Sequence, residues 1–156
     1  MAKKTKLTAT LPNGEMITRT TERTYTHVVV YTINEAKMMA ACWVPDQEKQ
    51  ERKNFKYYVE CAAGEHEHRY APAGSDQWKI DNAATYRKQA QDIIAEFPTV
   101  EAYLAGRKAK AEYYARKQIG AGWHVAGWCG RPDLAQKLAA GGCHHVAGEI
   151  KIIEVN

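Results

Sequence analysis

The feature that most constrains the fold of this chain is a turn signal near its start. Pro12-Asn13-Gly14 separates two threonine-rich runs, residues 6–11 and 15–21. An Asn-Gly pair between two such runs is a strong short-range signal for a β-hairpin. We therefore expect the chain to begin with a two-stranded antiparallel ribbon.

The next segment, residues 22–33, is dense in β-branched and aromatic residues, which predicts one long strand. Side chains alternate between the two faces of a strand, so Arg23, Tyr25 and His27 are expected on one face, together with Val29 and Tyr31. That face carries both rings and charge and is a candidate binding surface.

The middle of the chain is expected to mix helices, loops and one strand. Residues 35–43 favour a short helix, and residues 55–61 favour a second strand. Charged residues 45–54 and the glycine- and proline-containing residues 63–76 are expected to form exposed, mobile loops or, in the first case, a helix end. Two helices follow, over residues 81–96 and from the Thr99 cap to about residue 118, because Pro98 separates two apolar periodic runs.

The end of the chain is punctuated most clearly. We expect a strand over 123–129 and then a helix over 132–140 that starts at Pro132. A turn at Gly141-Gly142 and a strand over 146–155 are expected to follow. Together these elements predict a single domain over residues 1–156 of the α+β class. Its sheet is expected to be largely antiparallel, with an N-terminal β-hairpin and helices packed on one side.

The composition is that of an ordinary globular protein. Of 156 residues, 45% are hydrophobic and 26% charged, and 22 Lys and Arg against 18 Asp and Glu give a net charge of +4. A mild positive charge permits anionic ligands without requiring a nucleic acid. Since no apolar run approaches the roughly 20 residues needed to span a bilayer, we expect no membrane partner and a cytoplasmic location.

Arg131 is the leading candidate for an anion site. It lies where the helix predicted over 132–140 presents its unpaired backbone N–H groups, and Trp128 stands just upstream. A guanidinium at a positive helix end suits a phosphate, and an indole suits a base or ribose. The alternative is that Arg131 caps a turn and forms a local salt bridge.

A second cationic candidate lies on the helix predicted after Thr99. Arg107, Lys110, Tyr114 and Lys117 fall at helical spacing and share one face. This face suits an acidic polymer or partner, whereas a solvated basic helix surface is the more common role of such a pattern.

Catalytic and metal-binding signatures are not found in the sequence. The cysteines, at positions 42, 61, 129 and 143, form no C-x-x-C pair and are expected to be reduced. His66 and His68, and the group Cys143, His144 and His145, would hold a metal only if the fold brought them together, and solvated loops are their more usual fate. We expect no cofactor and no enzymatic activity; an acid/base role for His27 or His145 is a weaker alternative.

Two stretches carry a resemblance to a known family. Leu11 to Gly14 with Arg23 to Val30, and Gly127 to Lys137, resemble the Thoeris anti-defence family of phage sponge proteins. The resemblance covers the two ends of the chain. It implies an oligomeric α+β protein that binds cyclic ADP-ribose-like immune signals without cleaving them, and cyclic oligonucleotides at a separate surface. The resemblance implies a ligand-binding role for Arg131 and for the face formed by Arg23, Tyr25 and His27. The ring that stacks on the base in the family is assigned to no position of this sequence.

The leading hypothesis is therefore a phage-type sponge that sequesters cyclic nucleotide signals in the cytoplasm of the host cell, in aid of immune evasion. Its candidate ligand residues are Arg131, Trp128, Arg23, Tyr25, His27 and Arg107, and a pocket at a homo-oligomer boundary would enclose the ligand. The alternative is a basic interaction module that binds nucleic acid or a host protein through the Arg107 to Lys117 face. Binding to a polynucleotide would weaken more steeply with salt than binding to a small enclosed ligand.

Overall fold

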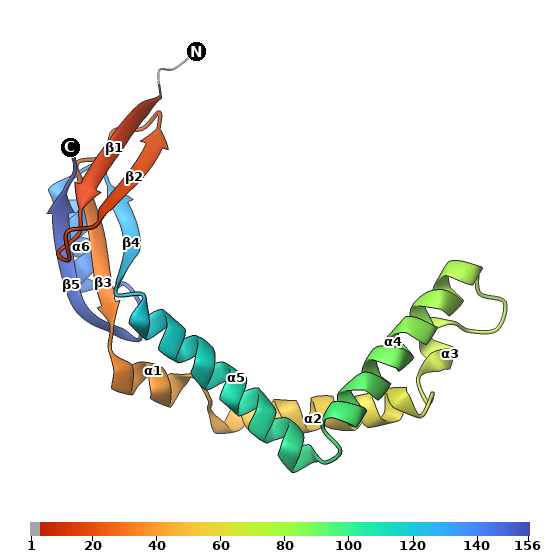
Figure 1. The fold of residues 1–156 in the computed structure, drawn as a ribbon. Helices are drawn as coiled ribbons and strands as arrows, with labels where there is room; N and C mark the ends of the chain where they lie inside the picture. The colour runs from red at the N-terminus through yellow and green to blue at the C-terminus, as the bar shows by residue number, and fades with distance from the viewer. Residues whose placement is uncertain (1–3) are drawn as a thin grey trace. The chain divides into compact units, whose positions relative to one another are not determined.

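The computed structural model describes residues 4–156, which form two compact units (Figure 1). The sheet unit comprises residues 4–42 and 113–156, and the helical unit comprises residues 43–112. The sequence analysis predicts one domain, and the described residues of the chain group into these two compact units. Among residues 4–156, no helix combines the length and the apolar character needed to cross a membrane.

The sheet unit begins with the predicted hairpin. Strands β1 (Thr5–Thr10) and β2 (Met16–Thr21) pair antiparallel, with Leu7 opposite Arg19. Gly14 takes a φ of 86° in the connecting loop, a conformation that glycine adopts without steric cost. The Asn13-Gly14 signal therefore marks the turn correctly.

A three-stranded antiparallel sheet forms the centre of this unit. Strand β3 (His27–Ile33) lies between β4 (Trp123–Cys129) and β5 (Ala147–Glu154). Helix α1 (Glu35–Ala41) follows β3, and helix α6 (Pro132–Ala140) connects β4 to β5. The α+β class, the antiparallel sheet and the N-terminal hairpin are thus confirmed.

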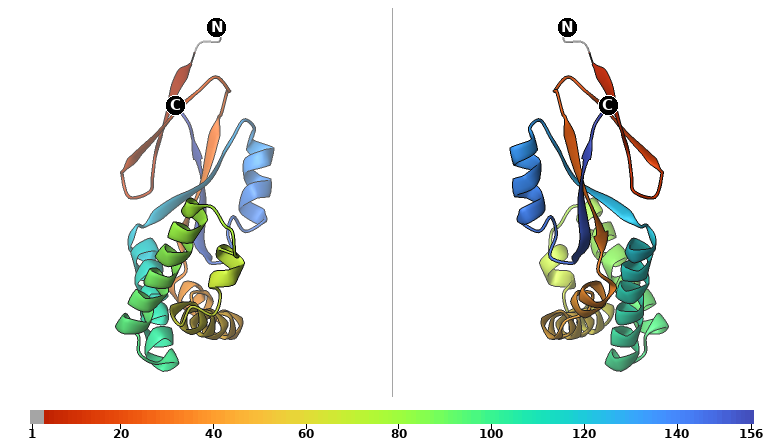
Figure 2. Two further views of the ribbon diagram at one scale, coloured as in Figure 1. Left: turned by 90° about the vertical axis from the view of Figure 1, so that its right-hand side faces the viewer. Right: turned by 90° about the vertical axis from the view of Figure 1, so that its left-hand side faces the viewer.

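Strand β3 is covered on both faces. Val28 and Val30 pack against Ala9 and Leu11 of the hairpin side, and Val29 packs on the opposite face against Ala135 of α6. All three valines are fully buried, at 0% exposure. Figure 2 shows the hairpin and α6 on opposite sides of the sheet, so one face carries a helix and the other a β-ribbon.

The helical unit consists of α2 (Pro45–Ala62), α3 (Glu67–Tyr70), α4 (Gln77–Glu96) and the first part of α5 (Val100–Gly120). Its core is formed by Phe55, Tyr103 and Leu104. Pro98 ends α4, and Thr99 caps α5, its Oγ1 accepting from the backbone N–H of Ala102 at 3.1 Å. Both predicted helix boundaries here are confirmed.

The prediction for residues 45–61 is wrong. The expected loop or helix end at 45–54 and the expected strand at 55–61 form one helix, α2. Glu51, Phe55 and Tyr58 recur at helical spacing, and Phe55 and Tyr58 pack against Tyr103 of α5. The aromatic content of residues 55–61 favours a strand locally, but burial of this helical stripe outweighs that preference.

Two further predictions need correction. Residues 63–76, expected to be a loop, contain the short helix α3. The long strand expected over 22–33 is β3 alone, because residues 22–26 form an irregular connection between β2 and β3. The strands at the chain's end and the helix at 132–140 are confirmed.

Two glycines of α5 test the packing of the helical core. A Cβ on Gly106 would lie 2.6 Å from Cε1 of Phe97, whereas a Cβ on Gly120 would meet nothing within 4 Å. Alanine favours a helix by up to about 1 kcal/mol over glycine, but overpacking a core costs about 1–3 kcal/mol. We expect G106A to lower the free energy of unfolding by about 1 kcal/mol and G120A to leave it unchanged or raise it, measured by chemical denaturation. Stabilisation by G106A would show that Phe97 moves aside freely.

Candidate anion-binding hollow

The candidate site lies at the end of β2 and in the connection that follows it. An open hollow of about 360 Å³ is lined there by Lys4, Arg19, Thr20, Thr21, Glu22, Arg23 and Tyr25. All these residues belong to the sheet unit. We call this site the hairpin hollow.

Tyr25 is the aromatic residue that lines the hollow, and Trp128 lies next to it. The ring centroids of Tyr25 and Trp128 are 6.4 Å apart, at an interplanar angle of 60°. The guanidinium carbon of Arg19 lies 4.8 Å from the Tyr25 centroid and 6.0 Å from the Trp128 centroid. The ring faces attract the cation electrostatically and hold it in place without neutralising its charge.

The sheet register brings Trp128 to this position. Trp128 lies opposite Val28 in the β3–β4 ladder, so its side chain shares the face on which Val28 packs against the hairpin. Trp128 consequently packs with the hairpin core and reaches Tyr25. The sequence-predicted candidates Trp128, Tyr25 and Arg23 are therefore brought to one region of the molecule.

The hollow has an excess of positive charge. Its lining holds three basic residues and one acidic residue, Glu22. Within residues 4–156, the ion pairs closer than 4.0 Å involve other side chains, and neither Lys4, Arg19 nor Arg23 takes part in one. Such a cluster of like charges suits an anion with several oxygens, because each cation can then bind an oxygen.

Arg131 does not belong to the hollow. It stands at the start of α6 as predicted, but its side chain makes no capping hydrogen bond, is 66% exposed and donates from Nη2 to Asp133 Oδ2 at 3.1 Å. The local salt bridge left as the alternative is what forms. Helix α6 covers the face of the sheet opposite to Trp128, so the joint pocket predicted for Arg131 and Trp128 does not form.

His27 is also separated from Tyr25. It begins β3 and pairs with Cys129, which packs on the α6 face, whereas Tyr25 contacts Trp128 on the hairpin face. Its Nδ1 is hydrogen-bonded to Thr26 Oγ1 at 2.7 Å. The predicted common face of Arg23, Tyr25 and His27 is wrong, because strand alternation does not extend into residues 22–26.

Arg107 has a structural partner in the helical unit. Its Nε and Nη2 donate to Glu51 Oε1 at 3.2 and 2.9 Å, and Tyr103 Oη donates to Glu51 Oε2 at 2.8 Å. Burial by itself raises the pKa of Glu51, but the hydrogen bonds from Arg107, Tyr103 and Asn54 outweigh it and hold this pKa below its ordinary 4.5. The charge of Arg107 is thus already matched inside the protein.

The histidine groups have partners within their own units. His66 Nε2 donates to Glu60 Oε2 at 2.8 Å, and its ring stacks on Tyr57. The ring of His144 stacks on Tyr31 and lies 4.3 Å from that of His145. Over the described part of the chain, His, Cys, Asp and Glu form no group of three or more that could hold a metal ion.

The sequence analysis missed Lys4 and Arg19 of the hollow. Arg19 lies on a predicted strand between threonines, and nothing in its immediate sequence distinguishes it from an ordinary exposed cation. Only the ring pair formed by Tyr25 and Trp128, which are distant in sequence, singles it out. Comparison of the chain with protein-family models, curated proteins and solved structures gives no match.

The Glu51 network predicts a pH-dependent loss of stability. R107A leaves a nearly buried carboxylate without its cation, and we expect the free energy of unfolding at pH 7 to fall by about 1–3 kcal/mol, less than for a fully buried pair because the Arg107 side chain is 43% exposed. Since the depressed pKa of Glu51 stabilises the fold only while the group is ionised, the difference from wild type should shrink as pH falls below 4.5.

Denaturant titrations at several pH values measure this effect. K88A, which removes a surface pair with Asp92, is the matched control and should cost less than about 0.5 kcal/mol at any pH. If R107A lowered the free energy of unfolding by the same amount at every pH, ionisation of Glu51 would not be what makes the network stabilising.

Proposed function

We propose that the protein binds a phosphate-bearing nucleotide in the hairpin hollow and holds it without chemical change. The observation that carries this proposal is the position of Arg19, a cation held by two rings and without a carboxylate partner among residues 4–156. Phosphate oxygens suit Arg19, Arg23 and Lys4, and a base suits the ring of Tyr25, which lines the hollow.

The lining of the hollow supports binding rather than catalysis. It offers threonine hydroxyls, one phenol and one carboxylate beside its cations, but no histidine or cysteine among the described residues that line it. A general base that operates near neutral pH is most often a histidine, and a strong nucleophile is often a thiolate. We therefore favour capture over turnover.

The sponge hypothesis gives this proposal its first ligand class. The resemblance to the Thoeris anti-defence family implies cyclic ADP-ribose-like signals, which combine phosphates with an adenine ring, in the cytoplasm of an infected host. In this form of the proposal the site is the hairpin hollow and no longer Arg131. Because the hollow is open, enclosure of a small ligand would require a second copy of the chain, in keeping with a homo-oligomer.

The openness of the hollow also favours a second candidate, a polynucleotide. A single strand could follow the cations with its phosphates and stack one base on the ring pair. This candidate keeps the interaction-module alternative but moves it from the Arg107 face to the hairpin hollow. The two ligand classes differ in salt dependence, which is steep for a polymer that releases counterions.

Calorimetry with cyclic ADP-ribose isomers, cyclic dinucleotides and a short single-stranded DNA tests both candidates. Mass spectrometry of the ligand released by denaturation should recover it unchanged if the protein is a sponge. Failure of all these probes to bind would refute the proposed function. Recovery of a cleaved product would instead make the protein an enzyme.

Neutralising two cations of the hollow should weaken binding of whichever nucleotide binds. For R19Q/R23Q we expect a loss of at least about tenfold in affinity, since each charged hydrogen bond contributes about 1.5–3 kcal/mol. For single-stranded DNA, the slope of log K against log salt should fall in magnitude by about 1.4, because two phosphate contacts are removed. The control K88Q/K108Q removes the same charge from surface ion pairs. R131Q should bind as wild type, and loss of binding in R131Q alone would return the site to α6.

The ring of Tyr25 has a separate test. Y25F keeps the ring and should retain affinity, whereas Y25L should weaken binding about 5- to 100-fold, as expected for loss of one base-stacking ring. Calorimetry gives the affinities. Because Tyr25 is half-buried, thermal unfolding of both variants is measured as well, to show that they still fold. Equal affinity of Y25L and wild type would leave the cations as the only binding groups.

A further inference from the structure

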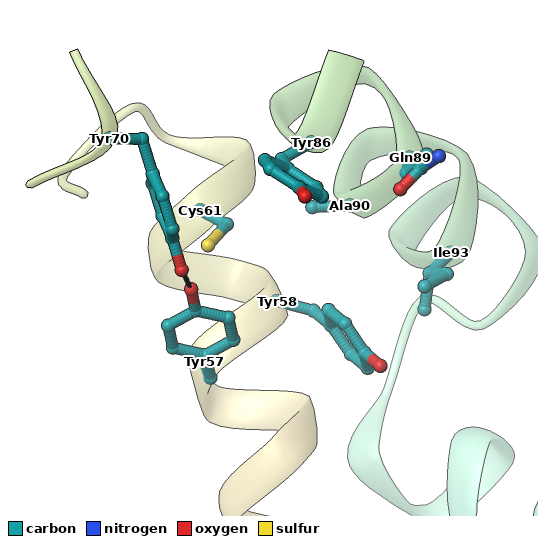
Figure 3. Close-up of a pocket in the computed structure, with 8 residues that line it drawn as sticks. All are labelled: Tyr57, Tyr58, Cys61, Tyr70, Tyr86, Gln89, Ala90 and Ile93. Carbon is teal, nitrogen blue, oxygen red and sulfur yellow. Dashed lines mark hydrogen bonds between the residues drawn. The ribbon is translucent and has the colours of Figure 1, made fainter. Parts of the chain in front are cut away.

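The helical unit contains a cavity that the proposed function does not use. It is a partly open pocket of about 400 Å³ between α2, the end of α3 and α4 (Figure 3). Its lining consists of Tyr57, Tyr58, Cys61, Tyr70, Tyr86, Gln89, Ala90 and Ile93. We call it the tyrosine cavity.

The aromatic walls of this cavity are held by contacts within the helical unit. The hydroxyls of Tyr57 and Tyr70 are hydrogen-bonded to each other, and the Tyr57 ring stacks on His66 with centroids 4.9 Å apart. Tyr58 packs edge-on against Tyr103 of the core, at 6.1 Å. Because Tyr57, Tyr58 and Tyr70 are held in this way, ordering them costs little conformational entropy when a ligand binds.

The cavity wall is uncharged. None of its eight lining residues is Lys, Arg, His, Asp or Glu. Two acidic residues of α2 and α3 are already paired, Glu60 with His66 and Glu67 with Arg87. A cationic ligand would therefore find aromatic faces but no free carboxylate there, and a phosphate would find no cation on the wall.

The wall also presents polar groups that a ligand could use, and those of Tyr86 and Gln89 belong to solvent-exposed residues. The Tyr58 and Tyr86 hydroxyls and the Gln89 amide form no hydrogen bond within residues 4–156. Beside the cavity, a smaller hollow shares Cys61, Tyr70 and Tyr86 with it and is also lined by Arg87. Nε of Arg87 is buried there and has no hydrogen-bond partner in the described chain. An aliphatic ligand would offer none of these groups a hydrogen-bond partner.

We propose that the tyrosine cavity binds a small neutral heteroaromatic compound of the nucleobase class. Flat rings stack on tyrosine faces, and ring nitrogens and carbonyls hydrogen-bond to an amide and to phenols. The volume lies within the range of small-molecule sites, about 300–1,000 Å³. This inference does not rest on the proposed function, since the cavity and the hairpin hollow belong to different units.

Saturation-transfer NMR and calorimetry on the full chain test the proposal, with adenosine and uridine as probes. Tetramethylammonium and cyclohexanol serve as cationic and aliphatic controls. We expect saturable binding of at least one nucleoside and none of either control. Y86L and Q89L should each weaken nucleoside binding, Y86L by about tenfold, because the first loses a stacking ring and the second a hydrogen-bonding amide.

The matched control is W78L on the same helix. Trp78 is an exposed aromatic residue of α4, at 60% exposure against 51% for Tyr86, and it does not line the cavity. W78L should bind the nucleoside as wild type, and R19Q/R23Q should do so too. The proposal is overturned if neither nucleoside binds, if Y86L and Q89L bind as wild type, or if tetramethylammonium or cyclohexanol binds as tightly as the nucleosides.

Discussion

The burial of Val28, Val29 and Val30 on both faces of β3 is the constraint on which the sheet unit depends. A strand with one apolar face needs a packing partner on that face only. Strand β3 is apolar on both faces, and the hairpin packs on one of them and α6 on the other. The same burial fixes the register of β4, since a slip of one residue would turn every side chain of β4 to the other face. Trp128 lies opposite Val28, so the packing of three valines also sets the indole beside Tyr25 and Arg19.

Arg19 and Arg107 show how environment decides what an arginine can do. Arg107 meets Glu51, a carboxylate of which 8% of the side chain is exposed, and two donor bonds hold the pair. Arg19 meets ring faces, which orient a guanidinium but leave its charge and its donors available. A ligand phosphate competes with a carboxylate at the first arginine and only with water at the second. Residue type and helical spacing cannot separate these cases, because the partners come from other elements.

The sequence predicts the ends of this chain better than its middle. The reason is that the sequence signals at the ends act on neighbouring residues, whereas the structure of the middle depends on contacts between distant residues. Asn13-Gly14, Pro132 and the glycines after α6 act within a few residues, so the hairpin and α6 follow from local chemistry. Residues 55–61 are aromatic and β-branched enough for a strand, and only their burial against α4 and α5 makes them a helix. The site follows the same rule. Arg23, Tyr25 and Trp128 are recognisable as candidates, but their grouping with Arg19 depends on the irregular connection at 22–26 and on sheet register.

The way the chain passes between its units explains why two chemically different hollows can coexist. Thr32, near the end of β3, lies opposite Trp123, the first residue of β4, so the chain leaves the sheet and returns to it at neighbouring ladder positions. The sheet can therefore complete its hydrogen bonding whatever the intervening helices do, and the helical unit has its own core of Phe55, Tyr103 and Leu104. Each unit then satisfies its own packing. A cationic, open hollow in one and a neutral, tyrosine-lined cavity in the other impose no conflicting requirement on a shared core.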